Sequence, residues 1–344
     1  MKEETTIYDI AHLLDLSAAT VSRALKDHPA INSKTKELVI AKANELGYRS
    51  NKFASNLRRK RTNTLGVIVP KLDSAFMSSV LAGMEKVANN AGYHLLIMQS
   101  LESELKEKAN VETMFSNRVD GLLVSLAFDT VGLEHFEKFF QRKIPVLFFD
   151  RNMDDSSCCS IVIDNCKAGY ELTNHLIEQG CRNLMHVTGN LNRNVYDLRF
   201  RGFKRALLEN EVVFDPAQLI INDLSEEAGE QVAHHFHSMA VKPDGIFITN
   251  DFCATSCVRT LKKLGYRIPD DLAIAGFNND PVSRFIEPQL TTINYPGKLM
   301  GETAVNRMID ALDTGIAYNK TEILPYSLLI RSSTTKTAVI EKFA

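Results

Sequence analysis

The sequence lacks the long apolar runs and nucleotide-binding loops that mark several large classes of protein. None of its apolar runs approaches the roughly 18 residues that a membrane-spanning helix needs. No secretory signal begins the chain, so we expect a soluble cytoplasmic protein. Neither a phosphate-cradling Walker loop nor a glycine-rich dinucleotide fingerprint occurs, so nothing points to nucleotide chemistry.

Residues suited to metal binding or catalysis are few and poorly spaced. The six cysteines include one adjacent pair and one C-x-x-x-C, neither a strong zinc spacing, so we expect reduced, buried thiols. His234, His235 and His237 fit a polar surface helix. No Ser-His-Asp order or nucleophile elbow stands out, and the carboxylates lack a recognisable acid–base context. We therefore expect no enzyme, no cofactor and no metal.

The N-terminal segment instead predicts three short helices around a small core. Apolar residues at i, i+3, i+4 and i+7 give the first helix one apolar stripe, and Thr6 with Asp9 has the spacing of a capping box. A good N-cap, Ser17, begins the second helix. The third is expected over residues 33–46, because Gly47 is a natural residue to follow a helix end. Two short helices joined by a tight turn are typical of the helix-turn-helix of DNA-binding proteins.

This segment resembles the DNA-binding domain of the LacI/GalR (lactose-repressor) family. The matching residues of the family pattern are Thr6, Asp9, Ala11, Ser17, Thr20, Val21, Ser22 and Arg23. The family usually has glycine in the turn where this chain has Asp15, a residue that tolerates the left-handed conformation. The resemblance extends over the whole chain and implies a sequence-specific transcriptional regulator. A three-helix cap without a role at DNA is the plainer alternative.

Charge divides the chain in agreement with DNA binding. Residues 1–61 hold twelve Lys/Arg against seven Asp/Glu, whereas residues 62–344 carry a net charge of −7. A basic head on an acidic body is typical of phosphate contact confined to one domain. We therefore expect residues 1–50 to form the DNA-binding domain and residues 51–61 a hinge.

The resemblance implies roles for individual residues of the head. Arg23 could contact guanine O6 and N7, whereas alanines offer only apolar contact to a thymine methyl. Hydroxyls nearby would hydrogen-bond phosphates, which fixes the register without reading sequence. The expected base-reading residues are Ala18, Ala19 and Arg23, and the expected phosphate contacts are Thr20, Ser22 and Asn51.

Residues 51–61 resemble the hinge helix of the family. Leu57 falls on the leucine that wedges into the minor groove at the operator centre, and Ala54 on the small residue one turn earlier. Such an apolar wedge kinks the duplex. Two hinges must meet there, which implies a homodimer on a pseudopalindromic operator. An ordinary amphipathic linker, with Leu57 packed on the body, is the alternative.

The body, residues 62–344, is expected to be an α/β fold of two parallel-sheet subdomains, like the periplasmic binding proteins. Eight short apolar runs alternate with helical stretches, and several helices close with glycine before the next run. This alternation favours βαβ units with buried parallel strands. By resemblance, the first subdomain takes residues 62–160 and 291–322, and the second takes residues 161–290 and 323–344.

Several segments of the body resemble the effector cleft of the family. Ligands of such folds bind at the carboxyl ends of the strands. Polar side chains beside an aromatic floor suit a sugar-like ligand, because buried hydroxyls need hydrogen-bond partners. The expected effector-binding residues are Phe76, Met77, Arg193, Asn194, Arg199, Asp251 and Asn278. The alternatives are Phe76 as ordinary core and Asp251 as a helix cap.

One departure from the family bears on the effector. Asn278 stands where the family usually has Asp, and together with Arg193 and Arg199 it favours an anionic effector such as a sugar acid or phosphorylated sugar. A neutral sugar or a purine is the alternative. We expect a DNA-binding repressor gated by this effector, which either releases operator DNA or promotes binding. A transport-type sugar-binding protein and a sugar-modifying enzyme are the alternative functions.

Overall fold

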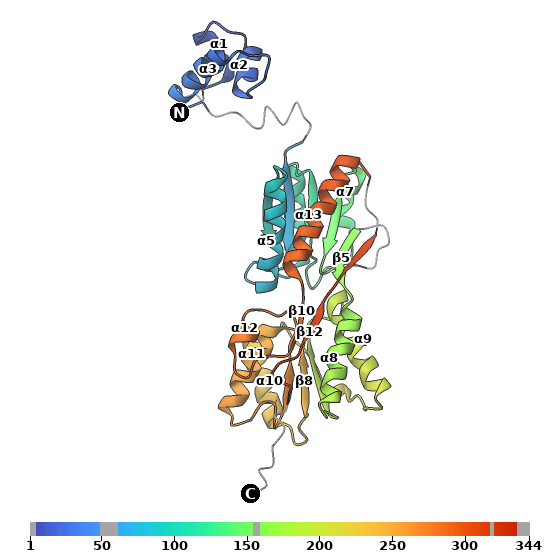
Figure 1. Ribbon diagram of the computed structural model, residues 1–344. Coiled ribbons are helices and arrows are strands. Elements are labelled where there is room, and N and C mark those ends of the chain that lie inside the picture. The colour runs from blue at the N-terminus through green and yellow to red at the C-terminus, as the bar shows by residue number, and fades with distance from the viewer. Residues whose placement is uncertain (1–4, 49–60, 154–158, 317–319, 336–344) are drawn as a thin grey trace. The chain divides into compact units, whose positions relative to one another are not determined.

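The chain folds into two compact units, Met1–Thr62 and Asn63–Ala344. The computed structural model describes residues 5–48, 61–153, 159–316 and 320–335. Figure 1 shows the first unit as a small helical head and the second as a larger α/β body. Three predicted DNA contacts, Asn51, Ala54 and Leu57, lie outside the described residues, so their roles stay predictions.

The head contains the three predicted helices, α1 (Ile7–Leu13), α2 (Ala18–Leu25) and α3 (Ser33–Glu45). The capping box is present, since Thr6 and Asp9 each accept a backbone hydrogen bond from the other. Ser17 caps α2, and Asp15 in the turn before it has a φ of 51°, the left-handed conformation expected there. The core residues that the three helices share are Ile10, Ala11, Val21, Ala24, Val39 and Ala43.

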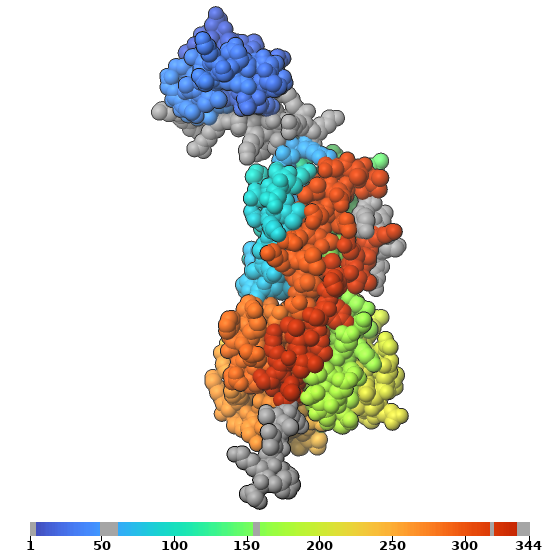
Figure 2. Space-filling view, viewed as in Figure 1, coloured from blue at the N-terminus to red at the C-terminus, as the bar shows by residue number. Residues whose placement is uncertain are grey.

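A six-stranded sheet forms the first subdomain of the body, in the order β11-β5-β4-β3-β1-β2. Every pair in it is parallel. Its strands are β1 (Thr64–Val69), β2 (His94–Gln99), β3 (Gly121–Val124), β4 (Val146–Phe149), β5 (Cys159–Ile163) and β11 (Thr321–Leu324). Its helices are α5 (Ala75–Asn90), α6 (Glu104–Ser116), the 3-10 turn η1 (Glu134–Phe136), α7 (Glu137–Gln141) and α13 (Gly297–Thr314). Although α5 and α13 are far apart in sequence, they lie side by side (Figures 1 and 2).

The second subdomain has a four-stranded parallel sheet in the order β7-β6-β8-β9. Its strands are β6 (Leu184–Thr188), β7 (Leu219–Ile221), β8 (Gly245–Ile248) and β9 (Ala273–Ala275). Its helices are α8 (Asn165–Glu178), α9 (Asn194–Glu209), the 3-10 turn η2 (Pro216–Gln218), α10 (Glu226–Ser238), α11 (Asp251–Lys263) and α12 (Val282–Phe285). Helices α8 and α9 pack as one pair and α10 and α11 as another.

The chain passes three times between the subdomains (Figure 1). At the second and third passages it forms two strands, β10 (Thr292–Asn294) and β12 (Ser327–Leu329), which pair with each other in antiparallel fashion. The sequence predicts passages near residues 160, 290 and 323. The first and third come a few residues later, because β5 and β11 stay paired in the first sheet through Ile163 and Leu324. Both of these side chains are buried, so each strand continues until its last apolar residue is covered.

The eight apolar runs of the body are all strands, as predicted, whereas four short strands, β7, β10, β11 and β12, were not among them. The predicted surface histidines lie exposed on α10. The expectation of buried thiols is wrong for Cys166, which is half-buried because it sits in the first turn of α8; Cys158 lies outside the described residues. None of the described helices is both long and apolar enough to cross a membrane.

Candidate functional site

One face of α2 carries the side chains predicted to contact DNA. Ala19 and Arg23 are exposed, whereas Ala18, Thr20 and Ser22 are half-buried at the margin of this face. The opposite face of α2 packs into the core of the head. An arginine on the free face of such a helix can reach the edge of a base in the major groove.

The start of α2 is fixed by two hydroxyl groups. The backbone N–H of Thr20 donates to Ser17 Oγ at 3.1 Å, and the two hydroxyl oxygens lie 2.8 Å apart. The N-cap therefore also orients the hydroxyl of Thr20 in the first turn, where a phosphate contact is predicted.

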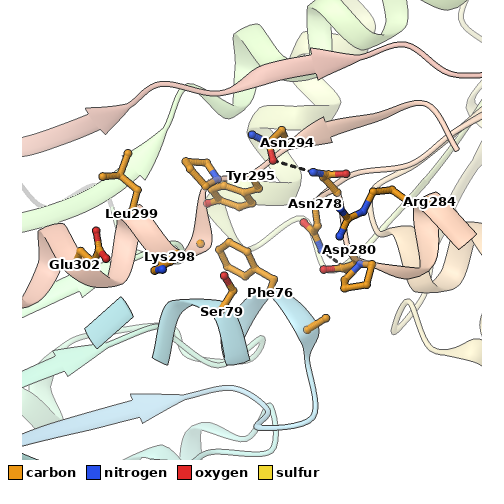
Figure 3. Close-up of a pocket in the computed structure, with 15 residues that line it drawn as sticks. Phe76, Ser79, Asn278, Asp280, Arg284, Asn294, Tyr295, Lys298, Leu299 and Glu302 are labelled. Atoms are coloured by element: carbon orange, nitrogen blue, oxygen red, sulfur yellow. Dashed lines mark hydrogen bonds between the residues drawn. The ribbon is translucent and has the colours of Figure 1, made fainter. Parts of the chain in front are cut away.

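A pocket of about 620 Å³ lies beside β10, with walls from both subdomains (Figure 3). Small-molecule sites typically measure about 300–1,000 Å³. The starts of α5 and α13 line it on one side, and residues 278–281 with Arg284 line it on the other. The pocket thus has the size of a small-molecule site and touches both subdomains.

Two stacked aromatic rings form one wall of this pocket. The rings of Phe76 and Tyr295 lie 4.4 Å apart with an angle of 22° between their planes. A Cβ on Gly297 would lie 3.3 Å from the ring of Phe76, closer than side chains normally pack. Glycine at this position leaves room for the stack. Such a wall suits the apolar face of a ligand ring.

Amide and charged side chains form the other walls of the pocket. Asn279 donates to Asn294 Oδ1 at 2.9 Å, and the amide of Asn278 lies 3.4 Å from Asp280 Oδ2 (Figure 3). Burial raises the pKa of Asp280 to about 6. Exposed Arg284 also lines the pocket. These groups can both donate to and accept from a polar ligand.

Asp251 forms hydrogen bonds both to the loop of residues 278–281, which lines the pocket, and to β10 in the passage between the subdomains. Its carboxylate accepts hydrogen bonds from the backbone N–H of Asp280 and from the hydroxyl of Thr292, both at 2.8 Å. The side chain is fully buried, and burial together with the nearby Asp280 raises its pKa to about 7. Asp251 does not line the pocket; it holds the loop that does.

Arg199 lies behind the aromatic wall rather than in the pocket. Its guanidinium lies 3.6 Å from the centre of the Phe277 ring and 5.6 Å from that of Tyr295. It donates to Asn165 Oδ1 at 2.8 Å and to the carbonyl of Thr249 at 3.2 Å. Burial lowers the pKa of this arginine. The hydrogen-bond acceptors of the Arg199 guanidinium are therefore Asn165 and Thr249 of the protein itself.

Arg193 and Asn194 lie in the seam where the subdomains meet directly. Asn194 donates to the carbonyl of Asp150 at 3.3 Å and accepts from the backbone N–H of Asn152 at 3.1 Å. Arg193 donates through Nη2 to the carbonyl of Thr130. Its Nε and Nη1 are buried without a hydrogen-bond partner among the described residues. Burial and, secondarily, nearby Arg151 lower the pKa of Arg193.

The structure therefore divides the seven predicted effector residues. Phe76 and Asn278 line the pocket. Met77 is buried in the core of the body, and Arg193, Asn194, Arg199 and Asp251 bond to the chain itself. The sequence analysis missed Tyr295, Asn294, Arg284 and Lys298, which line the pocket. Asn294, Tyr295 and Lys298 follow Leu290-Thr291-Thr292-Ile293, which was predicted only as a passage between the subdomains. No sequence signal pointed to Arg284.

Within the described parts of the chain, no group of three or more His, Cys, Asp or Glu residues is placed to hold a metal ion. A helix-turn-helix head joined to a two-subdomain α/β body defines a DNA-binding protein with a periplasmic-binding-protein-like body. Comparison with known proteins agrees. Residues 6–51 match the bacterial regulatory proteins of the lacI family, and residues 173–334 match the periplasmic binding protein-like domain.

Relatives are similar over nearly the whole chain. Catabolite control protein A of Staphylococcus xylosus is 30% identical over 330 residues, which cover 96% of this chain and 99% of that protein. The transcriptional repressor CytR of Escherichia coli (strain K12) is 29% identical over 339 residues, covering 97% of this chain and 98% of that protein. The lac repressor dimer bound to operator and the anti-inducer ONPF matches with a TM-score of 0.86 at 25% identity, covering 97% of this chain and 100% of that chain.

The chain therefore belongs to the LacI family of bacterial regulatory proteins. It is a DNA-binding transcriptional regulator and not an enzyme.

Proposed function

We propose that this regulator is a repressor whose affinity for operator DNA is controlled by a small molecule bound in the pocket beside β10. The observation that carries the proposal is that both subdomains supply walls of this pocket. A ligand shifts a conformational equilibrium only when it binds the two states with different affinity. A ligand that contacts both subdomains has this property whenever the subdomains move relative to each other.

The effector is a sugar or a sugar acid. The stacked rings of Phe76 and Tyr295 offer an apolar wall, and the amide of Asn278 can donate to and accept from hydroxyl groups. Arg284 and Lys298 supply positive charge at the pocket for a carboxylate. In support, the similar lac repressor dimer is bound to the anti-inducer ONPF.

The head reads the operator through α2. We assign base contacts to Ala18, Ala19 and Arg23, and phosphate contacts to Thr20, Ser22 and Asn51. Ala54 and Leu57 of the hinge, residues 51–61, would enter the minor groove. Two copies of the chain would bind one pseudopalindromic operator, as a homodimer; the match to a lac repressor dimer on its operator supports this arrangement.

DNase footprinting of the purified chain on the DNA upstream of its own and neighbouring genes tests the proposal. The DNA is titrated with protein alone and with each member of a panel of neutral sugars, uronic acids and sugar phosphates. We expect a protected palindrome that one compound abolishes or strengthens, and the direction of the change identifies an inducer or a corepressor. Weak, sequence-blind and steeply salt-dependent binding that no compound alters would overturn the proposal.

The same titration with a variant of the pocket separates effector binding from DNA binding. Asn278→Ala should weaken the response to the compound and leave the ligand-free footprint unchanged. A response to the compound as strong as that of the parent would contradict the placement of the effector in the pocket.

A further inference from the structure

A row of contacts closes the seam between the subdomains on the side of Tyr295 away from the pocket. The contributing residues of the first subdomain are Phe128, Thr130, Asp150, Arg151 and Asn152, and those of the second are Asn190, Arg193, Asn194 and Tyr196. We call these nine residues the latch. All of these contacts join protein atoms of one subdomain directly to protein atoms of the other.

The centre of the latch is an arginine held between two aromatic rings. The guanidinium of Arg151 lies 4.4 Å from the centre of the Phe128 ring and 5.6 Å from that of Tyr196. It donates to the hydroxyl of Tyr196 at 3.2 Å across the seam and to Glu102 at 2.7 Å within its own subdomain. The side chain is 10% exposed, so water competes little with these contacts.

Asn194 fastens the neighbouring part of the latch. It is bonded both to the carbonyl of Asp150 and to the N–H of Asn152. A third bond joins Asn190 Nδ2 to the carbonyl of Phe128 at 3.3 Å. Arg193, however, is left with two buried nitrogen atoms that have no partner among the described residues. Unpaired buried donors cost free energy, so the latch combines several favourable bonds with a penalty that opening would relieve.

Tyr295 connects this latch with the pocket. One face of its ring stacks on Phe76 in the pocket wall, and its hydroxyl donates to Asp150 Oδ1 at 2.8 Å. Burial and the Asp150 carboxylate raise the pKa of Tyr295 well above the usual value, so the hydroxyl stays protonated and donates. Asp150 is also the residue whose carbonyl accepts from Asn194. A displacement of the Tyr295 ring would therefore disturb Asp150, which is adjacent in sequence to Arg151 at the centre of the latch.

We propose that this latch holds the two subdomains closed and that Tyr295 couples it to the pocket, so that a ligand which moves the ring opens the seam. The latch consists of contacts within the chain, whereas its use in regulation rests on the proposed function of the pocket. Tyr295 acts here as a positioning residue through Asp150.

Hydrogen–deuterium exchange of the full-length, ligand-free protein tests the proposal. The reporter is the amide of Asn152, which is bonded to Asn194 across the seam, together with peptides covering residues 125–131 and 190–196. Asn194→Ala and Arg151→Met remove latch contacts directly. We expect exchange in all three segments to rise by about tenfold in both variants, because each loses a buried hydrogen bond that must break for opening. Unchanged protection in both would overturn the latch.

Tyr295→Phe tests the coupling. This substitution keeps the stacked ring and removes only the hydroxyl, which lies outside the three reporter segments. We expect faster exchange in the same three segments, in the pattern of Asn194→Ala. Tyr266→Phe is the matched control, since its hydroxyl bonds His237 within the second subdomain, and it should leave the seam unchanged. Normal protection in Tyr295→Phe beside opening in Asn194→Ala would refute the coupling and leave the latch intact.

This experiment involves neither DNA nor effector. The exchange experiment can therefore support the latch even if footprinting contradicts the proposed effector-controlled repressor. The failure of one proposal is thus distinguishable from the failure of the other.

Discussion

Gly301 of α13 and Val80 of α5 touch through their backbones, since a Cβ on Gly301 would collide with the carbonyl oxygen of Val80. The reverse contact is equally close, because a Cβ on Gly83 would collide with the carbonyl oxygen of Lys298. The two helices can approach this far only while both positions lack side chains. Phe76 and Lys298, at the starts of these two helices, both line the pocket, so the glycine contacts hold together the wall that the first subdomain contributes.

Gly301→Ala should destabilise the body by about 1–3 kcal/mol, because the added methyl group has no space and the helices must separate. The urea midpoint, followed by far-UV circular dichroism, measures the change. Asn306→Ala lies on an exposed position of the same helix and is the control, with a midpoint close to that of the parent. A parental midpoint for Gly301→Ala would mean that the helices separate without cost, contrary to the packing described here.

The elements of this fold could be predicted from the sequence because their signals are local. Each buried parallel strand needs a run of apolar residues, and the glycines that end helices take positive φ, as Gly92 and Gly180 do at 77° and 94°. The short strand β7 was missed because only three residues, Leu219–Ile221, represent it. A run of three apolar residues does not stand out from the chain around it.

The pocket could be predicted only in part, because its walls depend on partners far apart in sequence. Phe76 was identified from its place after the first strand, but its stacking partner Tyr295 belongs to a passage with no periodic pattern. Arg199 was predicted from the resemblance, which implies a ligand-contacting arginine in the loop and helix of residues 192–203. That its guanidinium would be bonded to Asn165 and Thr249 depends on the packing of α8 and β8, which no local signal carries.

Asp251 should make the stability of the body fall as the pH rises. Its pKa of about 7 lies above the unfolded value of 3.8, so folding favours the protonated carboxyl. The stabilisation that this preference provides is complete below about pH 4 and is lost as the pH rises through 7. Between pH 5.5 and pH 8 we expect the parent protein to lose about 2 kcal/mol of unfolding free energy relative to Asp251→Asn. Asp251→Asn stays neutral and should lack this decline.

Urea titrations of both proteins at the two pH values measure the effect. Asp270→Asn is the control, because this carboxylate is exposed and its removal should leave the pH dependence of the parent. Parallel pH profiles for the parent and Asp251→Asn would show that the buried carboxylate ionises without cost.

His186 should have the opposite effect at lower pH. Its ring lies 4.7 Å from the rings of both Phe203 and Phe247, and neither ring nitrogen has a partner among the described residues. Burial lowers its pKa to about 3, below the unfolded value of 6.5. The neutral ring is therefore favoured, and its stabilisation is complete above pH 6.5 and is lost as the pH falls toward 3. The stabilisation lost by pH 5 is about 2 kcal/mol.

His186→Leu should remove this acid sensitivity, since the variant has no ring to protonate. The quantity to compare is the difference in unfolding free energy between pH 7 and pH 5, taken relative to the parent. His234→Gln changes an exposed histidine of α10 and should behave like the parent. If His186→Leu loses as much stability on acidification as the parent does, the burial of a neutral ring is not the cause.

Arg23 should decide which operators the head accepts. It stands on the exposed face of α2, where a guanidinium can bond both acceptors of a guanine in the major groove. Arg23→Ala should cost about 1–3 kcal/mol on the operator and relax the preference at one base position. Lys26→Ala removes a neighbouring exposed charge to which no base contact is assigned, so we expect it to weaken binding to operator and scrambled DNA alike. Salt titrations separate the two, because loss of one phosphate contact lowers the salt slope by about 1 on every sequence. An equal loss on operator and scrambled DNA for Arg23→Ala would place Arg23 among the phosphate contacts and leave base reading to other residues of α2.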